Sequence, residues 1–118
     1  AGCRFEDVVV HRAEFIVDIH NPAGAGQAEE HIQYWDPYDL PYRCFTPRGV
    51  ENLYVAGRCI SGTHRAHASY RVMSICMAMG EAVGIAAAMC AERGCTPRTL
   101  DVAALQQRMA AKGIELFD

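Results

Sequence analysis

The clearest hydrophobic pattern in the chain is the run from Val72 to Ala91, in which only Ser74 and Glu81 are strongly polar. Apolar residues would lie on nearly every face of a helix over this run, so we expect that helix to be mostly buried. Gly94 and then Pro97 are placed to end it. The run is also long enough to span a membrane, but its central glycines and Glu81 favour a buried helix of a water-soluble protein.

One side of this predicted helix carries small residues at every fourth position: Cys76, Gly80, Gly84 and Ala88. A glycine inside a helix costs about 1 kcal/mol relative to alanine. Two central glycines are easiest to explain if a strand, another helix or a cofactor packs against the helix backbone. The spacing therefore predicts a close neighbour along this stripe.

Shorter patterns predict strands before the long helix. Runs of β-branched and aromatic residues indicate one strand at Asp7–Val10 and another at Phe15–Ile19. Two further strands, Tyr42–Phe45 and a buried Leu53–Ala56, would form a hairpin around a β-turn at residues 46–49.

The C-terminal pattern predicts a short amphipathic helix. Asp101 is a good N-cap, the apolar residues that follow it recur on one stripe, and Gly113 ends the pattern. Together these elements predict an α+β fold, in which a small β-sheet packs on the long buried helix and a second, short helix covers it.

Composition and charge narrow the functions to consider. The 118 residues, 51% of them apolar and 21% charged, suffice for one small domain or a piece of a larger one. A formal net charge of −3 disfavours binding to nucleic acid or to an anionic membrane surface. The six cysteines do not make a dense disulfide framework, and AGCRFEDVVV has no signal-peptide pattern. We therefore expect reduced thiols in a cytoplasmic setting.

The charge is unevenly distributed. The segment from residue 52 to residue 80 holds three arginines, two histidines and no carboxylate. Its basic residues lie between a predicted strand and the first turn of the long helix, where free N–H groups already supply positive potential. An anionic partner such as a phosphate or an electron-rich ring oxygen would balance this charge. Alternatively, the arginines reach solvent or pair with acids near Glu29 and Asp36. The basic residues are Arg58, His64, Arg65, His67 and Arg71.

This segment also resembles a known family. The string NLYVAGRCISGTHRAHASYRVMSICMAMGEAVGIAAA, preceded by DIHNP and PYDLPYRCFTPRGVENL, resembles the C-terminal flavin-contacting part of FAD-dependent oxidoreductases related to glutathione-reductase-type flavoproteins. The resemblance covers most of the chain, from Arg4 to Gly94. It implies an FAD cofactor and a fragment of a Rossmann-like FAD-binding fold, whose last parallel strand would be Leu53–Ala56.

The resemblance implies particular contacts with FAD. The turn after the last strand would lie at the pyrophosphate and ribityl chain, and the start of the long helix at flavin N1 and O2. Negative charge develops at N1 and O2 when flavin is reduced, and helix-terminal N–H groups stabilise it. Many relatives have an acid where Arg58 stands, and an arginine favours a phosphate over a ribityl hydroxyl. The implied cofactor-binding residues are Ala56, Gly57 and Arg58 in the turn, Ser61 and His64 near the flavin, and Arg71, Val72 and Met73 at the helix start.

The resemblance also divides the chain. Residues 1–46 would belong to a substrate-side sheet domain, and residues 47–118 to the C-terminal part of the FAD-binding domain. The G-x-G-x-x-G that opens a dinucleotide-binding fold is missing, because the nearest string, Gly24 to Glu29, ends in Glu instead of glycine. We therefore expect a C-terminal fragment, inactive alone, whose partners are the N-terminal dinucleotide-binding unit of a parent flavoprotein and a small-molecule substrate.

Candidate catalytic residues are few. His20 and Arg43 face the expected substrate side, where either could bind a carboxylate or move a proton, and His64 would lie near the flavin. Each is also compatible with a purely structural role.

Two other groups of residues have simpler interpretations. Cys59, His64 and His67, even with Cys44, lack the close cysteine pair of a structural zinc site, so we expect no metal. The methionines at the start of the long helix are interpreted as core residues: Met73, Met77 and Met79.

Two functions from different classes follow. In the first, hydride passes between an organic substrate and flavin N5 while residues 52–73 hold the cofactor. In the second, the chain is a non-catalytic interaction module that forms a homo-oligomer through its Gly/Ala-striped helix.

Overall fold

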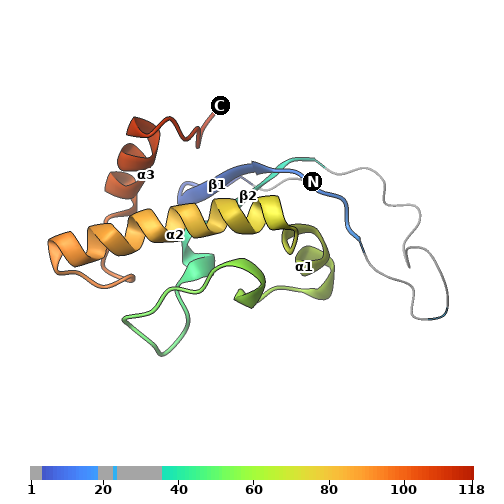
Figure 1. The fold of residues 1–118 in the computed structure, drawn as a ribbon, viewed down its shortest axis with the longest axis horizontal. Coiled ribbons are helices and arrows are strands. Elements are labelled where there is room, and N and C mark those ends of the chain that lie inside the picture. The colour runs from blue at the N-terminus through green and yellow to red at the C-terminus, as the bar shows by residue number, and fades with distance from the viewer. Residues whose placement is uncertain (1–3, 19–22, 24–35) are drawn as a thin grey trace.

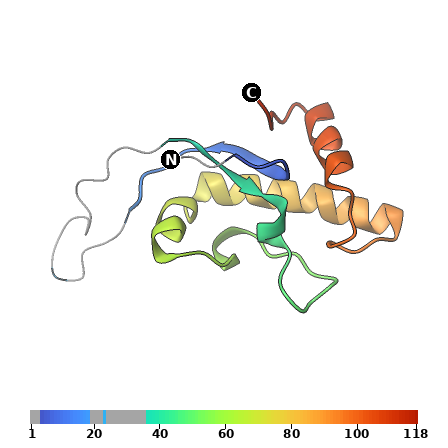
Figure 2. The ribbon, with the colours of Figure 1, turned by 180° about the vertical axis from the view of Figure 1, so that it is seen from behind.

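The structure is a computed structural model that describes residues 4–18, 23 and 36–118. A long helix, α2 (Met73–Arg93), extends along the molecule, and a two-stranded antiparallel sheet of β1 (Val8–Ala13) and β2 (Tyr38–Pro41) lies beside it (Figure 1). Helix α1 (His64–Tyr70) directly precedes α2, and α3 (Val102–Ala111) lies toward the other end of α2 (Figure 2). The described residues therefore form a small α+β arrangement, as the sequence predicts.

The first strand agrees with prediction and the second does not. Strand β1 begins within the predicted Asp7–Val10 and continues to Ala13. It pairs along its length with β2, a strand that the sequence did not indicate. The register shifts twice along this pair, and Arg12 has a left-handed φ of 54°, so the ladder is irregular. Residues 15–18 form no strand, and Ile19 lies outside the described residues.

The predicted hairpin is wrong. Tyr42–Phe45 forms a 3₁₀ helix, η1, and Leu53–Ala56 forms no regular element, although Val55 N donates to Phe45 O at 2.9 Å. Leu53, predicted to be buried, is 48% exposed. A strand requires a neighbouring strand along its length, and the described residues place no strand beside Leu53–Ala56.

The core lies between β1 and one face of α2. The three consecutive valines of β1 are buried, and α3 adds Leu105 and Met109 from the same side. The buried residues of α2 recur every three or four positions, as expected for one helix face. They are Ile75, Met79, Ala82, Ala86, Met89 and Cys90.

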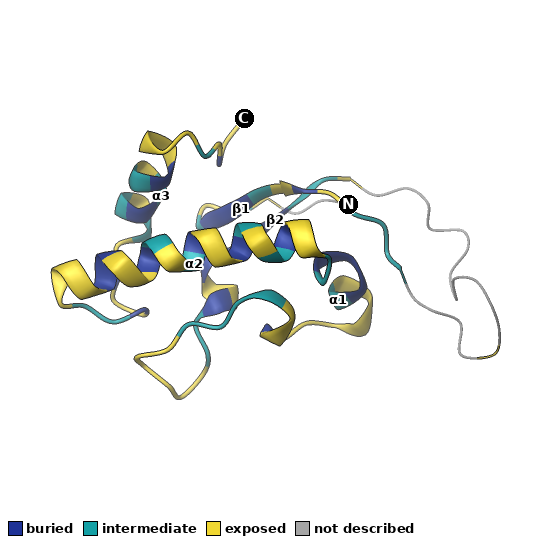
Figure 3. Ribbon diagram, viewed as in Figure 1, coloured by how far each residue is buried: buried dark blue, intermediate teal, exposed yellow. Residues whose placement is uncertain are grey.

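The opposite face of α2 is exposed, which corrects the prediction of a mostly buried helix (Figure 3). Only 33% of its most apolar stretch is buried, and a Cβ built at Gly80 or Gly84 would meet nothing within 4 Å. The expected close neighbour of the small-residue stripe is therefore absent from the described part of the chain. The physical reason is that a two-stranded sheet can cover only one side of this helix.

Of the helices in residues 4–18 and 36–118, only α2 is long and apolar enough to span a membrane, with a mean hydropathy of 1.6. Core helices of water-soluble proteins can satisfy the same criterion, and one face of α2 packs into the core.

The three predicted helix boundaries in the C-terminal half are confirmed. Gly94 ends α2 in the left-handed conformation, with φ of 65°. Asp101 begins α3 by accepting hydrogen bonds from Ala103 N at 3.0 Å and Ala104 N at 3.4 Å, and Gly113 follows the helix with φ of 84°.

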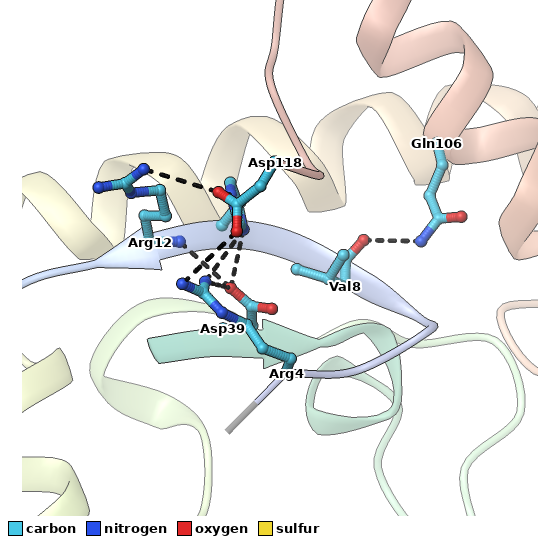
Figure 4. Close-up of polar contacts among 7 residues, drawn as sticks. Arg4, Val8, Arg12, Asp39, Gln106 and Asp118 are labelled. Carbon is cyan, nitrogen blue, oxygen red and sulfur yellow. Dashed lines mark hydrogen bonds and ion pairs between the residues drawn. The ribbon is translucent and has the colours of Figure 1, made fainter. Parts of the chain in front are cut away.

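A buried carboxylate ties the sheet to the N-terminal segment. Asp39 on β2, whose side chain is 3% exposed, accepts hydrogen bonds from Arg4 Nη1 at 2.8 Å and Arg12 N at 3.3 Å (Figure 4). His11 Nδ1 lies 2.9 Å from the same oxygen. Burial alone would raise the pKa of Asp39, but the hydrogen bonds from Arg12, His11 and Arg4 outweigh it and hold that pKa below its usual value.

The C-terminal segment reaches the same cluster. The Asp118 carboxylate lies 3.6 Å from Arg12 Nη1 and 3.2 Å from His11 Nε2. Gln106 of α3 donates to Val8 O at 3.0 Å (Figure 4). These contacts attach α3 and the residues after it to β1.

The Asp39 cluster predicts a pH dependence of stability. An aspartate whose folded-state pKa is below its unfolded value of about 3.9 stabilises the fold above that value, and this contribution is lost as the pH falls through the folded pKa. We expect Asp39→Asn to lower the free energy of unfolding by about 1–3 kcal/mol at neutral pH, and by much less once the pH has fallen below the folded-state pKa of Asp39. Urea unfolding measures both values. The exposed Asp36→Asn is the control, and a loss independent of pH would contradict the prediction.

A second stability prediction concerns the contact between Gly62 and Tyr70. Tyr70 is 5% exposed, and a Cβ at Gly62 would overlap its hydroxyl. We expect Gly62→Ala to destabilise the chain by about 1–3 kcal/mol, because the buried ring must move. Gly80→Ala is the matched control and should gain about 1 kcal/mol, since its Cβ has open space and alanine favours helix. Thermal unfolding compares them, and equal stability of the two variants would refute the contact.

Candidate functional site

A tight turn brings the acid-free segment against α2. Gly57 begins the short 3₁₀ helix η2 (Gly57–Cys59) with φ of 68°, a conformation that glycine adopts without a steric penalty. Its N–H group donates to Met79 Sδ at 3.2 Å. Because Met79 is fully buried in the core face of α2, this contact fixes the turn relative to that helix.

Arg58 lies next to the start of α2. Its Nε donates to Arg71 O at 3.0 Å, and its own carbonyl oxygen lies 3.1 Å from His67 Nε2. Within residues 4–18, 23 and 36–118, no carboxylate pairs with Arg58. Its guanidinium is therefore positioned by a backbone carbonyl while its charge is not neutralised by a described acid.

Arg71 has a different environment. Its Nη2 donates to Asp18 O at 2.8 Å and lies 3.5 Å from Asp18 Oδ2. The alternative in which arginines pair with this chain's own acids therefore holds for Arg71, although the acid is Asp18. Of the two acids named in that alternative, Asp36 does not pair with Arg71, and Glu29 lies outside the described residues.

The N-terminus of α2 has no side-chain cap among the described residues. Val72, in extended conformation, is its N-cap, and the first turn contains no acidic residue. The first N–H groups of a helix lack intrahelical partners and form its positive end. An anion would therefore find hydrogen-bond donors and positive potential here.

An open hollow of about 410 Å³ lies at this end of α2 and is lined by Arg58, Met73, Cys76 and Met77. Met73 and Met77 are 74% and 71% exposed, so their assignment to the core is wrong, whereas Met79 is a core residue. The two are exposed because they lie on the face of α2 opposite the sheet.

The structure brings together only part of the predicted cofactor-binding set. Gly57, Arg58, Arg71, Val72 and Met73 come together where the turn meets the start of α2. Ala56, the half-buried N-cap of η2, directly precedes them. Ser61 and His64 are exposed and do not line the hollow: His64 is the first residue of α1, and Ser61 lies in the loop before it.

Sequence reasoning missed Cys76 and Met77 as lining residues. Cys76 Sγ lies 3.5 Å from Arg71 O and 3.6 Å from Tyr70 O, so it also contacts the junction of α1 and α2. The positions of Met73, Cys76 and Met77 were a usable signal, because residues three and four apart share a helix face.

The remaining catalytic candidates do not join this site. Arg43 pairs with Asp7 Oδ1 at 2.6 Å and lies 4.9 Å from the centre of the Phe5 ring, contacts that hold η1 to the N-terminal segment. It does not line the hollow. His20 lies outside the described residues.

The residues weighed as metal ligands are not gathered. His67 packs edge-on against Tyr70, with 5.2 Å between ring centres, and Cys59 and Cys44 are exposed. In the described part of the chain, no three His, Cys, Asp or Glu side chains converge as a group that could hold a metal ion.

The residues at the start of α2 fit one end of a flavin nucleotide. An anionic phosphate or the electron-rich edge of a flavin requires N–H donors and positive charge, which the uncapped helix start and Arg58 supply. Met73 and Met77 add apolar side chains suited to contact with a flat ring.

Comparison with known proteins agrees with this chemistry. The family model described as FAD dependent oxidoreductase matches residues 1–109. No curated protein and no solved structure matches the chain. The match confirms FAD as the cofactor expected from the sequence and spans nearly the whole chain, which therefore belongs to the family of FAD dependent oxidoreductases.

Proposed function

We propose that this chain is the C-terminal part of an FAD-dependent oxidoreductase of the glutathione-reductase-related type, and that residues 52–73 hold FAD in it. When bound, FAD supplies hydride transfer between flavin N5 and an organic substrate. The family match supports the class of reaction. The observation that carries the proposal is the start of α2, which no described side chain caps, beside Arg58, which no described acid neutralises.

Each part of this site has a physical task. The N–H groups after Val72 would donate to the flavin edge or to a phosphate, and they stabilise negative charge without reorganising. Arg58 would add a charged donor whose position is already set by Arg71 O. Gly57 keeps the turn close to α2, so the arginine and the helix start face the same ligand.

The proposal includes a longer parent protein. The exposed face of α2 carries Met73, Met77, Gly80 and Gly84, and the chain has no G-x-G-x-x-G strand–helix unit. We infer that an N-terminal dinucleotide-binding unit of the parent covers this face and supplies the remaining FAD contacts. Leu53–Ala56 would then gain the strand neighbours that it lacks here.

Within the parent, we propose that residues 1–46 contribute to the substrate-side sheet and residues 47–118 to the FAD-binding domain. The two parts share one core, since Val8 and Phe45 are buried in the same cluster as Met79. The proposed boundary therefore divides the chain by function, and the two parts do not pack as separate domains. A small-molecule substrate, a cytoplasmic setting, and no binding to nucleic acid or membrane remain proposals from the sequence.

A second candidate, an interaction module that forms a homo-oligomer through α2, is favoured by one observation. The Gly80 and Gly84 positions are open, so another copy of the chain could approach the helix closely. The two candidates differ in what the basic turn does, because oligomerisation through the stripe does not need Arg58.

Substitution of Arg58 in the parent flavoprotein therefore tests the proposed function. We expect Arg58→Ala to weaken FAD binding about 10- to 100-fold. This corresponds to the loss of one hydrogen bond to a charged group, which contributes about 1.5–3 kcal/mol. Arg58→Lys, which keeps the charge, should lose less. Titration by flavin fluorescence measures the affinity.

Arg93→Ala is the matched control, because Arg93 is an exposed arginine at the other end of α2. Its FAD affinity should equal that of the unchanged protein, and all variants should keep the same oligomeric state. A parent that purifies colourless and does not bind added FAD would refute the flavoprotein assignment. Loss of assembly with FAD retained would favour the interaction module.

A further inference from the structure

The C-terminal end of α2 places two cysteines side by side. Gly94 adopts the left-handed conformation, and the N–H groups of Gly94 and Cys95 both point to Cys90 O, that of Cys95 at 3.1 Å. The bond from Cys95 N is the 6→1 bond of a Schellman ending, in which the residue after the left-handed glycine contacts the helix one turn back. Such a contact is usually between two apolar side chains, and here both positions are cysteine.

The two cysteine side chains share one surface hollow and can be reached from outside. The backbone hydrogen bond from Cys95 N to Cys90 O sets the two residues beside each other at the helix end. Both line an open hollow of about 360 Å³, together with Tyr54 and Pro97. Cys95 is half-buried and Cys90 is 8% exposed, so a small reagent entering the hollow meets Cys95 first.

A hydrogen-bonded network holds Cys90 in place. Tyr54 Oη lies 3.4 Å from Cys90 Sγ and 2.5 Å from Tyr42 Oη, and the Tyr42 hydroxyl donates to Pro97 O. This network joins α2 to the loop that follows it. Cys90 is thus held in an ordered helix ending, and Cys95 follows it in the same ending.

This pair is distinct from the FAD site. Cys90 lies seventeen residues after Met73 on the same helix, about 25 Å away at about 1.5 Å per residue. The other described cysteines have different surroundings: Cys44 and Cys59 are exposed, and Cys76 contacts backbone carbonyl groups.

We propose that Cys90 and Cys95 form a reversible disulfide by exchange with a low-molecular-weight disulfide, which closes the last turn of α2. The Cys95 thiolate attacks one sulfur of RS–SR, the S–S bond breaks, and RS⁻ leaves and is protonated. The Cys90 thiolate then attacks the Cys95 sulfur of the mixed disulfide and displaces the second RS⁻, which takes up the proton that Cys90 has lost. The two cysteines lose two electrons in total, and RS–SR becomes two RSH.

Trypsin makes the test specific, because it cuts after Arg71, Arg93 and Arg98 and so separates Cys90 from Cys95. The reduced chain is incubated with oxidised glutathione at about pH 8.5, near the pKa of a free thiol. Remaining thiols are alkylated, and the digest is analysed by mass spectrometry. We expect peptides 72–93 and 94–98 as one disulfide-linked species that dithiothreitol separates.

Cys76 shares the first peptide with Cys90, so it requires a control. The link should persist in Cys76→Ser and in Cys59→Ser, and disappear in Cys95→Ser. Glutathione adducts on separate peptides, a link that is lost in Cys76→Ser, or linkage between two chains would each overturn the proposal.

A second measurement follows the thermal unfolding of the unchanged chain. The closed disulfide restricts the unfolded chain, so oxidation should raise Tm by about 4–8 °C, and dithiothreitol should reverse the rise. Cys95→Ala, treated with the same reagents, should show no change. No rise in the unchanged chain would refute closure of the helix end. Neither measurement involves FAD. Failure of the disulfide proposal would therefore not contradict the proposed FAD binding, and failure of FAD binding would not contradict the disulfide proposal.

Discussion

The packing of one face of α2 on β1 is the interaction on which the rest of the structure depends. Buried Met79, Ala82 and Ala86 face the valines of β1, and they fix both the position and the rotation of the helix. Met79 also accepts a hydrogen bond from Gly57 N. Met79, which packs in the core, thus also positions the turn that carries Arg58. The geometry of the site therefore depends mainly on apolar packing.

The same packing leaves the other face of α2 uncovered, and this explains the character of the site. Among the described residues no side chain caps the helix start, and exposed methionines line its hollow, because these residues supply one layer of structure against α2. Arg71 is neutralised by Asp18, whereas Arg58 is held by a carbonyl that leaves its charge intact. The positive potential inferred from the acid-free segment is therefore concentrated on Arg58 and the helix end.

Local signals predicted α2 and α3 well, but they did not indicate α1 and they predicted the strands poorly. The ends of α2 and α3 depend on a left-handed glycine or an aspartate N-cap, which act within a few residues. Strand pairing depends on distant segments, so β2 was missed and Leu53–Ala56 did not form a strand here. Hydrophobicity showed that α2 is apolar all round, but it could not show which face would lack a neighbour.

For the site, the amino-acid sequence by itself determined the family, the FAD cofactor and the position of the basic turn before α2, because these follow from residue types and their order. Only the tertiary structure decided that Arg71 is paired with Asp18 while no described acid pairs with Arg58, and that Ser61 and His64 do not line the hollow. It also decided that Cys90 and Cys95 line the same hollow at the end of α2. Such facts depend on which side chains the folded backbone brings within a few ångströms, and spacing along the chain does not specify that distance.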